Sequence, residues 1–197
     1  FFLLMFLARA GGVFLPPAFF AFFVLFLLAL PVLTKNRTNV TDIAHVFLGV
    51  SYLGFGFFAF LSTRYLESGL ILSLWLLFST WANDTMAYFI GKYWGNKKLW
   101  PSISPNKTVA GSLAGILAAV SVSMLFSAFL PLPWHRLFVL GLIIGLAGQL
   151  GDLIESAVKR SFQVKDAGWI FPGHGGVLDR FDSLLVVFPV MYYLFLS

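Results

Sequence analysis

Long apolar stretches separated by short polar breaks run along most of this chain. About 20 consecutive apolar residues are enough to cross a bilayer as a helix. We therefore expect an all-α, polytopic membrane bundle of about six spans that forms a single transmembrane domain over residues 1–197. The pattern predicts helices over residues 13–33, 43–61, 69–91, 108–130, 137–160 and 177–196, the last beginning polar and ending apolar.

Composition supports a lipid environment. Hydrophobic residues make up 59% of the chain and charged residues 11%, with a mean hydropathy of +0.90, whereas soluble domains carry roughly 25% charged residues. The absence of cysteine excludes a disulfide framework, a thiol nucleophile and a thiolate metal site. Because the sequence begins with Phe1 rather than Met, we expect part of the N-terminal region to be missing.

Loop charge predicts the orientation. The loop 92–107 is rich in lysine and holds no acid, and two predicted spans separate it from the polar segment 161–176. Both segments must then lie on the same side, which the positive-inside rule assigns to the cytoplasm. We expect a polar cavity that faces the cytoplasm there. The net charge of +5 fits such loops and does not by itself require an anionic ligand.

A polar stripe marks the second half of the predicted helix 137–160. Residues spaced i, i+3, i+4 and i+7 share one helix face. The residues with this spacing are Asp152, Glu155, Ser156 and Lys159. Two carboxylates therefore line a stripe that runs into the bilayer, where acids mark function by default.

The predicted helix 177–196 carries a second acidic face, formed by Asp179, Asp182 and Ser183. Carboxylates on two facing helices can form an all-oxygen site for a hard cation such as Mg²⁺. The alternative is that these acids form interfacial salt bridges with the neighbouring basic residues Lys159, Arg160 and Arg180.

A glycine-rich turn, PGHGG at residues 172–176, lies between the two acidic faces. Exposed backbone N–H groups followed by a helix N-terminus can cradle a phosphate. Such a turn is also often a plain connector. His174 could be a ligand, an acid or base, or a phosphate donor, and it could equally be structural.

Asp84 stands inside the predicted span 69–91, roughly 10 Å from its cytoplasmic end. A carboxylate there is unfavourable by at least a few kcal/mol, so it should face the bundle interior and meet a cation, a basic side chain or a ligand. The alternative is an interhelical hydrogen-bond node with Asn83 and Thr85.

The segment 104–108, SPNKT, opens the predicted helix 108–130. Thr108 could cap this helix, and Lys107 would stand at its positive end, an arrangement that suits phosphate. A capped helix with a positive-inside lysine explains the same residues. The segment is not a P-loop, because the glycine spacing of that motif is missing.

Taken together, carboxylates, lysines and helix N-termini at one membrane boundary suit phosphoryl or nucleotidyl transfer to a lipid. The segment 156–182, SAVKRSFQVKDAGWIFPGHGGVLDRFD, resembles the signature of the phosphatidate cytidylyltransferase, or CDP-diacylglycerol synthase, family. Residues 83–88 (NDTMAY), 104–112 (SPNKTVAGS) and 151–156 (GDLIES) also resemble that family, in the expected order. The resemblance covers about residues 80–185; residues 1–68 match only in character.

The resemblance implies the reaction of CTP with phosphatidate to give CDP-diacylglycerol and diphosphate. It further implies Mg²⁺, with a second cation possible, a catalytic portion at 69–197, a homodimer, and no nucleic-acid partner. The expected location is the bacterial cytoplasmic membrane. Residues implied for catalysis are Asp152, Lys159, Asp179 and Asp182, with Asp152 and Asp179 first as metal ligands. Residues implied for substrate binding are Asn83, Asp84, Ser104, Lys107, Thr108, Arg160, Lys165, Asp166, His174, Gly175, Gly176 and Arg180.

Two other functions compete with this reading. The CDP-alcohol phosphotransferases use a D-G-x2-A-R pattern, which is absent here. A cation or proton transporter would use the membrane-embedded Asp84 and Asp152. The clustering of the acids at one boundary, with a glycine-rich turn and a lysine loop, argues against transport.

Overall fold

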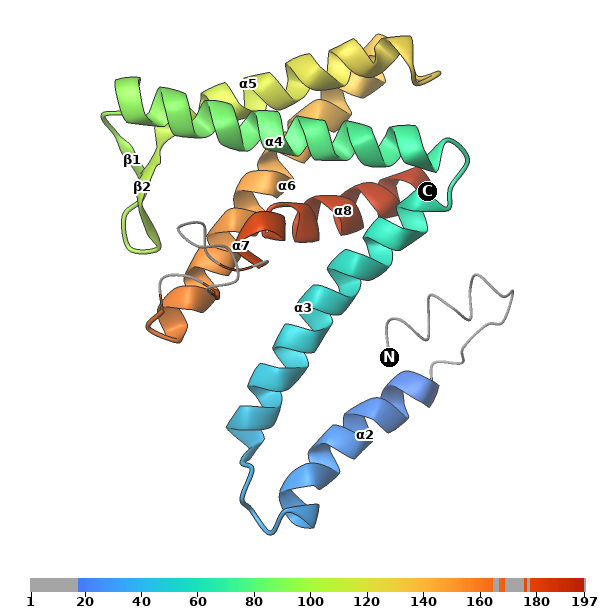
Figure 1. The fold of residues 1–197 in the computed structure, drawn as a ribbon, viewed down its shortest axis with the longest axis vertical. Coiled ribbons are helices and arrows are strands. Elements are labelled where there is room, and N and C mark those ends of the chain that lie inside the picture. The colour runs from blue at the N-terminus through green and yellow to red at the C-terminus, as the bar shows by residue number, and fades with distance from the viewer. Residues whose placement is uncertain (1–17, 165–166, 169–175, 177, 197) are drawn as a thin grey trace. The chain divides into compact units, whose positions relative to one another are not determined.

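The computed structural model describes residues 18–164, 167–168, 176 and 178–196, which are almost entirely helical (Figure 1). The prediction of an all-α membrane protein is confirmed. By length and composition, three helices among the described residues can cross a membrane, at Val40–Arg64, Val109–Ala128 and Trp134–Ser161. The count of about six spans stays a prediction. The chain divides into two compact units, Phe1–Ser62 and Thr63–Ser197.

The first unit contains α2 (Ala18–Leu33) and most of α3 (Val40–Arg64). Between them the chain turns through Lys35 and Asn36, both in the left-handed region. The start of α3 is fixed by a reciprocal cap, because Asp42 accepts from the backbone N–H of Asn39 at 3.0 Å and Asn39 accepts from that of Asp42 at 2.8 Å.

The second unit is a bundle built on α4 (Gly69–Trp94), α5 (Val109–Leu125) and α6 (Trp134–Ser161). Helices α4 and α5 run side by side, and α6 packs against both (Figure 1). Fully buried apolar side chains, such as Trp75 and Leu137, fill the space between them. The Trp75 indole N–H donates to Ser123 Oγ at 3.0 Å, which satisfies the polar end of this buried ring.

Small residues let α5 and α6 approach closely. A Cβ atom added at Gly145 would lie 2.9 Å from the Cα atom of Ile116, so only glycine fits at this crossing. This close packing is what the Gly, Ala and Ser content of the segment allows. A short 3₁₀ turn, η1 (Phe126–Ala128), follows α5.

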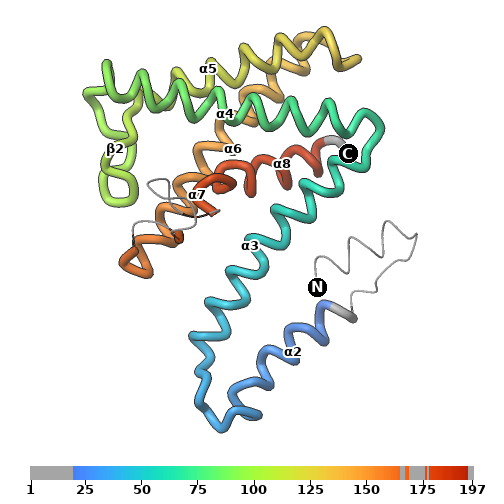
Figure 2. Tube along the Cα trace, viewed as in Figure 1, coloured from blue at the N-terminus to red at the C-terminus, as the bar shows by residue number. Residues whose placement is uncertain are grey.

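A β-hairpin connects α4 to α5 (Figure 2). Its strands are β1 (Lys98–Trp100) and β2 (Ser104–Thr108), paired antiparallel with Lys98 opposite Thr108. The sequence predicted a loop over 92–107, which was wrong in two respects. Helix α4 continues to Trp94, and strands β1 and β2 form a hairpin in the remainder. Such short polar strands lack the apolar alternation that would reveal them.

The predicted helix 177–196 is interrupted. It forms the single turn α7 (Leu178–Phe181) and then α8 (Leu184–Leu196). At the break the Asp182 carboxylate accepts from the backbone N–H of Ser183 at 2.7 Å, and the Ser183 carbonyl accepts from the N–H groups of Val186 and Val187 in the first turn of α8. Side chains of this type compete with helical hydrogen bonding. The expected continuous face carrying Asp179 and Asp182 was therefore wrong.

Candidate active site

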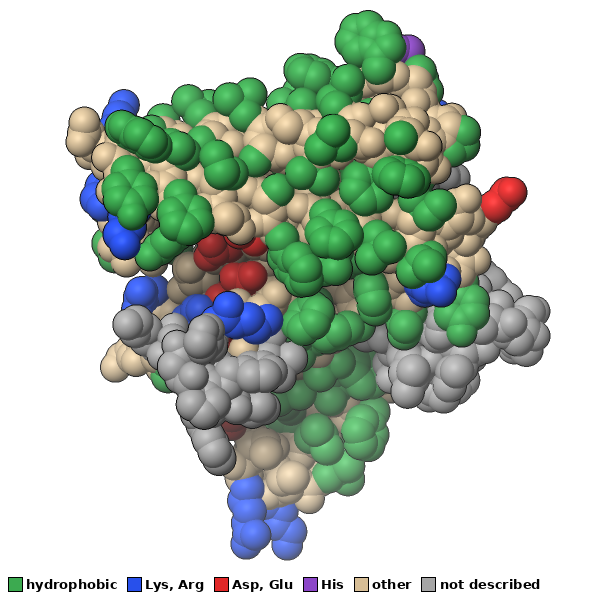
Figure 3. Space-filling view, turned by 45° about the horizontal axis from the view of Figure 1, so that its top comes forward, with side chains coloured by type: hydrophobic (Ala, Val, Ile, Leu, Met, Phe, Trp, Pro, Cys, Tyr) green, Lys and Arg blue, Asp and Glu red, His purple; other side chains and the backbone are tan. Residues whose placement is uncertain are grey.

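A cavity of about 480 Å³ opens in the second unit between α4, the hairpin, the start of α5 and the middle of α6. Its lining includes two acids, Asp84 and Asp152, and three lysines, Lys92, Lys98 and Lys107. Figure 3 shows acidic side chains in a hollow with basic side chains at its edge, within a largely apolar surface. The cavity can therefore hold a polar, charged ligand beside the membrane-embedded part of the protein.

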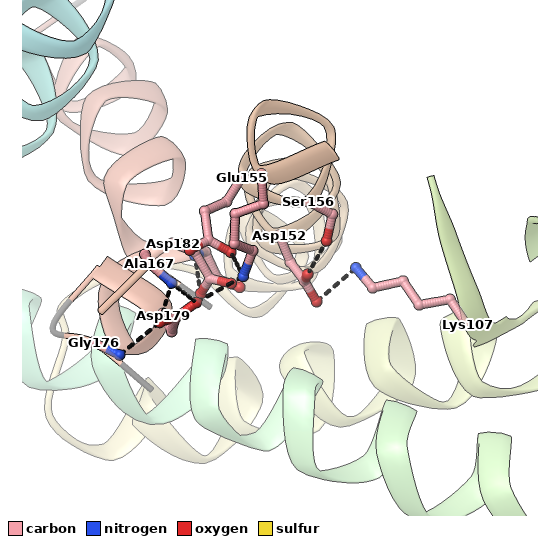
Figure 4. A network of polar contacts seen from close by, with 10 residues as sticks. Lys107, Asp152, Glu155, Ser156, Ala167, Gly176, Asp179 and Asp182 are labelled. Carbon is pink, nitrogen blue, oxygen red and sulfur yellow. Dashed lines mark hydrogen bonds and ion pairs between the residues drawn. The ribbon is translucent and has the colours of Figure 1, made fainter. Parts of the chain in front are cut away.

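An ion pair joins the hairpin to α6 inside this cavity. Lys107 extends from β2 toward α6, and its Nζ lies 2.6 Å from Asp152 Oδ2 (Figure 4). The other oxygen of Asp152 accepts from Ser156 Oγ at 3.3 Å. The predicted cap of α5 is confirmed, since Thr108 Oγ1 accepts from the Gly111 backbone N–H at 3.2 Å. Lys107 thus stands at the positive end of α5.

A second charged cluster surrounds Lys159, near the C-terminal end of α6. Its Nζ lies 2.5 Å from Glu155 Oε2 and 2.7 Å from Asp179 Oδ1. Asp179 Oδ2 also accepts from the backbone N–H groups of Ala167 at 2.9 Å and Gly176 at 2.7 Å. Glu155 and Asp179 therefore form salt bridges with Lys159, as the alternative prediction for the acids stated.

The two acids of the α7 region have opposite electrostatics. Burial alone would raise the pKa of Asp179, but the hydrogen bonds from Lys159, Gly176 and Ala167 outweigh it and lower that pKa to about 2. Burial raises the pKa of Asp182 to about 6, and the nearby Asp152 carboxylate adds to this rise. Asp179 is thus firmly ionised, whereas burial and the Asp152 carboxylate disfavour the charged form of Asp182.

A polar node links α4, α5 and α6 at the inner wall of the cavity. The Gln149 side-chain amide donates to Asn83 Oδ1 at 3.1 Å and to the Ser112 carbonyl at 2.8 Å, and it accepts from Ser112 Oγ. Because its Oδ1 is occupied, the fully buried Asn83 turns its Nδ2 toward Asp84 Oδ1, at 3.1 Å. A Cβ atom at Gly115 would lie 2.6 Å from Asn83 Oδ1, so this glycine makes room for the node.

A model of the cytidylyltransferase family matches residues 1–197. The chain belongs to the cytidylyltransferase family. Among similar proteins named phosphatidate cytidylyltransferase, that of Bacillus subtilis (strain 168) is 46% identical over 176 residues, which cover 88% of this chain and 65% of the relative. That of Staphylococcus haemolyticus (strain JCSC1435) is 45% identical over 167 residues, 84% of this chain and 64% of the relative. The chain thus spans somewhat less than two thirds of these relatives' length.

The structure brings several of the predicted site residues of this cytidylyltransferase family member together. Asn83, Asp84, Ser104, Lys107, Thr108 and Asp152 lie in or beside the cavity. Lys159, Gly176 and Asp179 form the second cluster, and Asp182 lies within electrostatic range of Asp84 and Asp152. Arg160 and Arg180 are exposed, at the last turn of α6 and in α7. Lys165, Asp166, His174 and Gly175 lie outside the described residues.

Gln149 was not among the predicted site residues. Sequence reasoning did not single out Ser112, Lys92 or Lys98 as individual site residues. A glutamine within an apolar span was the signal for the node. Nothing in the sequence could show that the hairpin directs Lys98 into the cavity.

The donor set suits the cation that the family resemblance implies. Mg²⁺ is usually bound through one or two carboxylates together with waters and substrate phosphates. Asp152 and Asp179 supply such oxygens, and each forms an ion pair with a lysine ammonium. Among the described residues no three His, Cys, Asp or Glu side chains converge as a ready-made metal cluster.

Proposed function

We propose that this chain transfers the cytidylyl group of CTP to phosphatidate, giving CDP-diacylglycerol and diphosphate for phospholipid synthesis. The observation that carries this proposal is the cavity lined by Asp84 and Asp152 together with Lys92, Lys98 and Lys107, beside membrane helices. The names of the relatives supply the substrates. Since the chain spans less than two thirds of those relatives, the activity is a proposal for this chain.

In the proposed reaction a phosphate oxygen of phosphatidate attacks the α-phosphorus of CTP. One P–O bond forms there, and the bond from that phosphorus to the bridging oxygen of the β-phosphate breaks, so diphosphate leaves with the electron pair. The attacking phosphate monoester is already anionic near neutral pH, so no protein base is required. The demand on the protein is to position two anions and to neutralise their charge.

The cavity lysines meet that demand directly. Lys92, Lys98 and Lys107 can neutralise the triphosphate, and the capped N-terminus of α5 adds a positive dipole end beside them. Mg²⁺, bound through Asp152 and Asp179, would supply further charge neutralisation on the phosphate oxygens.

Lys159 has a different place in the proposal. Glu155 and Asp179 hold its ammonium from two sides, so it is a fixed cation rather than a mobile one. Asp179 also accepts from the backbone N–H groups of Ala167 and of Gly176, the last residue of the glycine-rich turn. We therefore assign Lys159 and Glu155 to holding the Asp179 carboxylate in place beside Ala167 and Gly176.

The finer setting is also part of the proposal. We place the cavity on the cytoplasmic side of a bacterial cytoplasmic membrane, because its lysines follow the positive-inside rule and the relatives are bacterial. The homodimer rests on the family resemblance alone. The sequence contains no cysteine, so a single cysteine introduced in place of the exposed Lys97 would be its one thiol. Labelling of that thiol in intact cells shows on which side of the membrane it lies.

The direct test uses purified protein in detergent with phosphatidate, Mg²⁺ and CTP labelled in its α-phosphate. The proposal predicts label in a lipid product and release of one diphosphate for each lipid formed. Absence of lipid labelling together with ion flux in liposomes would instead favour the transporter alternative.

A further inference from the structure

Lys107 forms an ion pair with Asp152, one of the two carboxylates that the family resemblance implies as metal ligands. Its ammonium lies 2.6 Å from Asp152 Oδ2, and it is also an electrostatic neighbour of Asp84 and Asp182. The side chains of Lys107 and Asp152 are 23% and 33% exposed, so water only partly screens the pair. Figure 4 shows the lysine reaching across from β2 to α6 to make this contact.

The lysine and a divalent cation compete for the same oxygen. Hard cations bind carboxylate oxygens directly, so an ion at Asp152 would stand next to the Lys107 ammonium and be repelled by it. The lysine can leave, because its contact comes from a flexible side chain on a hairpin rather than from a packed helix. A nucleotide phosphate in the cavity would offer the ammonium a new partner at the moment the ion arrives.

We propose that Lys107 is a built-in counter-ion, which neutralises Asp152 before nucleotide and cation bind and moves onto a nucleotide phosphate when a divalent cation binds. The inference rests on the proposed function, because it takes the nucleotide as the incoming anion. It makes metal binding weak without nucleotide and stronger with it. Metal and nucleotide therefore bind cooperatively, with Lys107 as the group that couples them.

The test titrates Mn²⁺ into the detergent-solubilised protein without nucleotide or lipid, and follows free Mn²⁺ by electron paramagnetic resonance. Lys107→Gln is expected to bind Mn²⁺ at least about tenfold more tightly than the wild type, within the usual range of coupling between two sites. Lys97→Gln is the matched control, because it removes the same charge from an exposed position next to β1. Lys107→Arg keeps the charge and should bind Mn²⁺ as weakly as the wild type.

A second titration adds CTP at saturating concentration. The wild type should then bind Mn²⁺ more tightly than it does alone, whereas Lys107→Gln should gain much less from the nucleotide. Unchanged or weaker Mn²⁺ binding by Lys107→Gln without nucleotide would overturn the inference. Lys107→Met is the second neutral variant, and thermal unfolding of both verifies that the hairpin is intact.

The result is independent of turnover. If the protein transfers no cytidylyl group but Lys107→Gln still tightens Mn²⁺ binding, the counter-ion stands and the proposed reaction falls. If the protein is an active cytidylyltransferase and Lys107→Gln leaves Mn²⁺ binding unchanged, the reaction stands and the counter-ion falls.

Discussion

Replacing Asp179 by asparagine tests whether its carboxylate holds the backbone at Ala167 and Gly176. The side chain is 11% exposed and accepts from Lys159 Nζ and from the N–H groups of Ala167 and Gly176. A hydrogen bond to a charged group contributes about 1.5–3 kcal/mol. Asparagine loses the charge and keeps one acceptor oxygen, so we expect local opening to become easier by about 3 kcal/mol, which corresponds to roughly 100-fold faster amide exchange.

Hydrogen exchange followed by mass spectrometry measures this directly in peptides that contain Ala167 and Gly176. Asp42→Asn provides the control, since Asp42 also caps a backbone N–H but lies in the first unit. Exchange near Ala167 and Gly176 that is as slow in Asp179→Asn as in the wild type would refute the anchoring role. Loss of turnover with unchanged exchange would leave Asp179 a direct role in the reaction only.

Three further predictions concern the node, the helix packing and pH. Gln149→Met removes both donated hydrogen bonds and should lower the free energy of unfolding by about 2–3 kcal/mol; an unchanged thermal midpoint would remove Gln149 from the node. Gly145→Leu should lower stability by about 1–3 kcal/mol by forcing α5 and α6 apart, while Gly49→Ala, with open space around its Cβ, should not; equal effects would contradict the packing argument. Because the folded-state pKa of Asp182 is raised to about 6, its stabilising contribution is complete below about pH 4 and is lost as the pH rises through 6. Asp182→Asn should therefore gain stability relative to the wild type between pH 5 and 7, and parallel melting profiles would argue against this shift.

The helices of the bundle could be predicted from the sequence because apolar stretches of bilayer length have few alternatives. The predicted stretch 137–160 is α6 at Trp134–Ser161, and 43–61 is α3 at Val40–Arg64. Their ends were less exact because both helices extend beyond the apolar run. Helix α6 begins directly after Pro133, and α3 continues to Arg64. The α7–α8 break was missed because Asp182 and Ser183 interrupt the pattern only briefly.

The site could be predicted only as a set of residues. Local rules identified Thr108 as a cap, and its hydrogen bond confirms this. The pairing of Lys107 with Asp152 depends on how a hairpin folds over α6, and no local pattern encodes that contact. The node around Gln149 likewise requires three helices to meet at one level.

The central claim, that this cavity supports cytidylyl transfer, is tested most directly by steady-state formation of labelled lipid from CTP and phosphatidate in wild type and Asp152→Asn. The account predicts Mg²⁺-dependent CDP-diacylglycerol in the wild type and at least about a hundredfold slower turnover in Asp152→Asn, with the variant still folded by its thermal transition. Equal turnover in the two proteins, or none in a folded wild type, would contradict it.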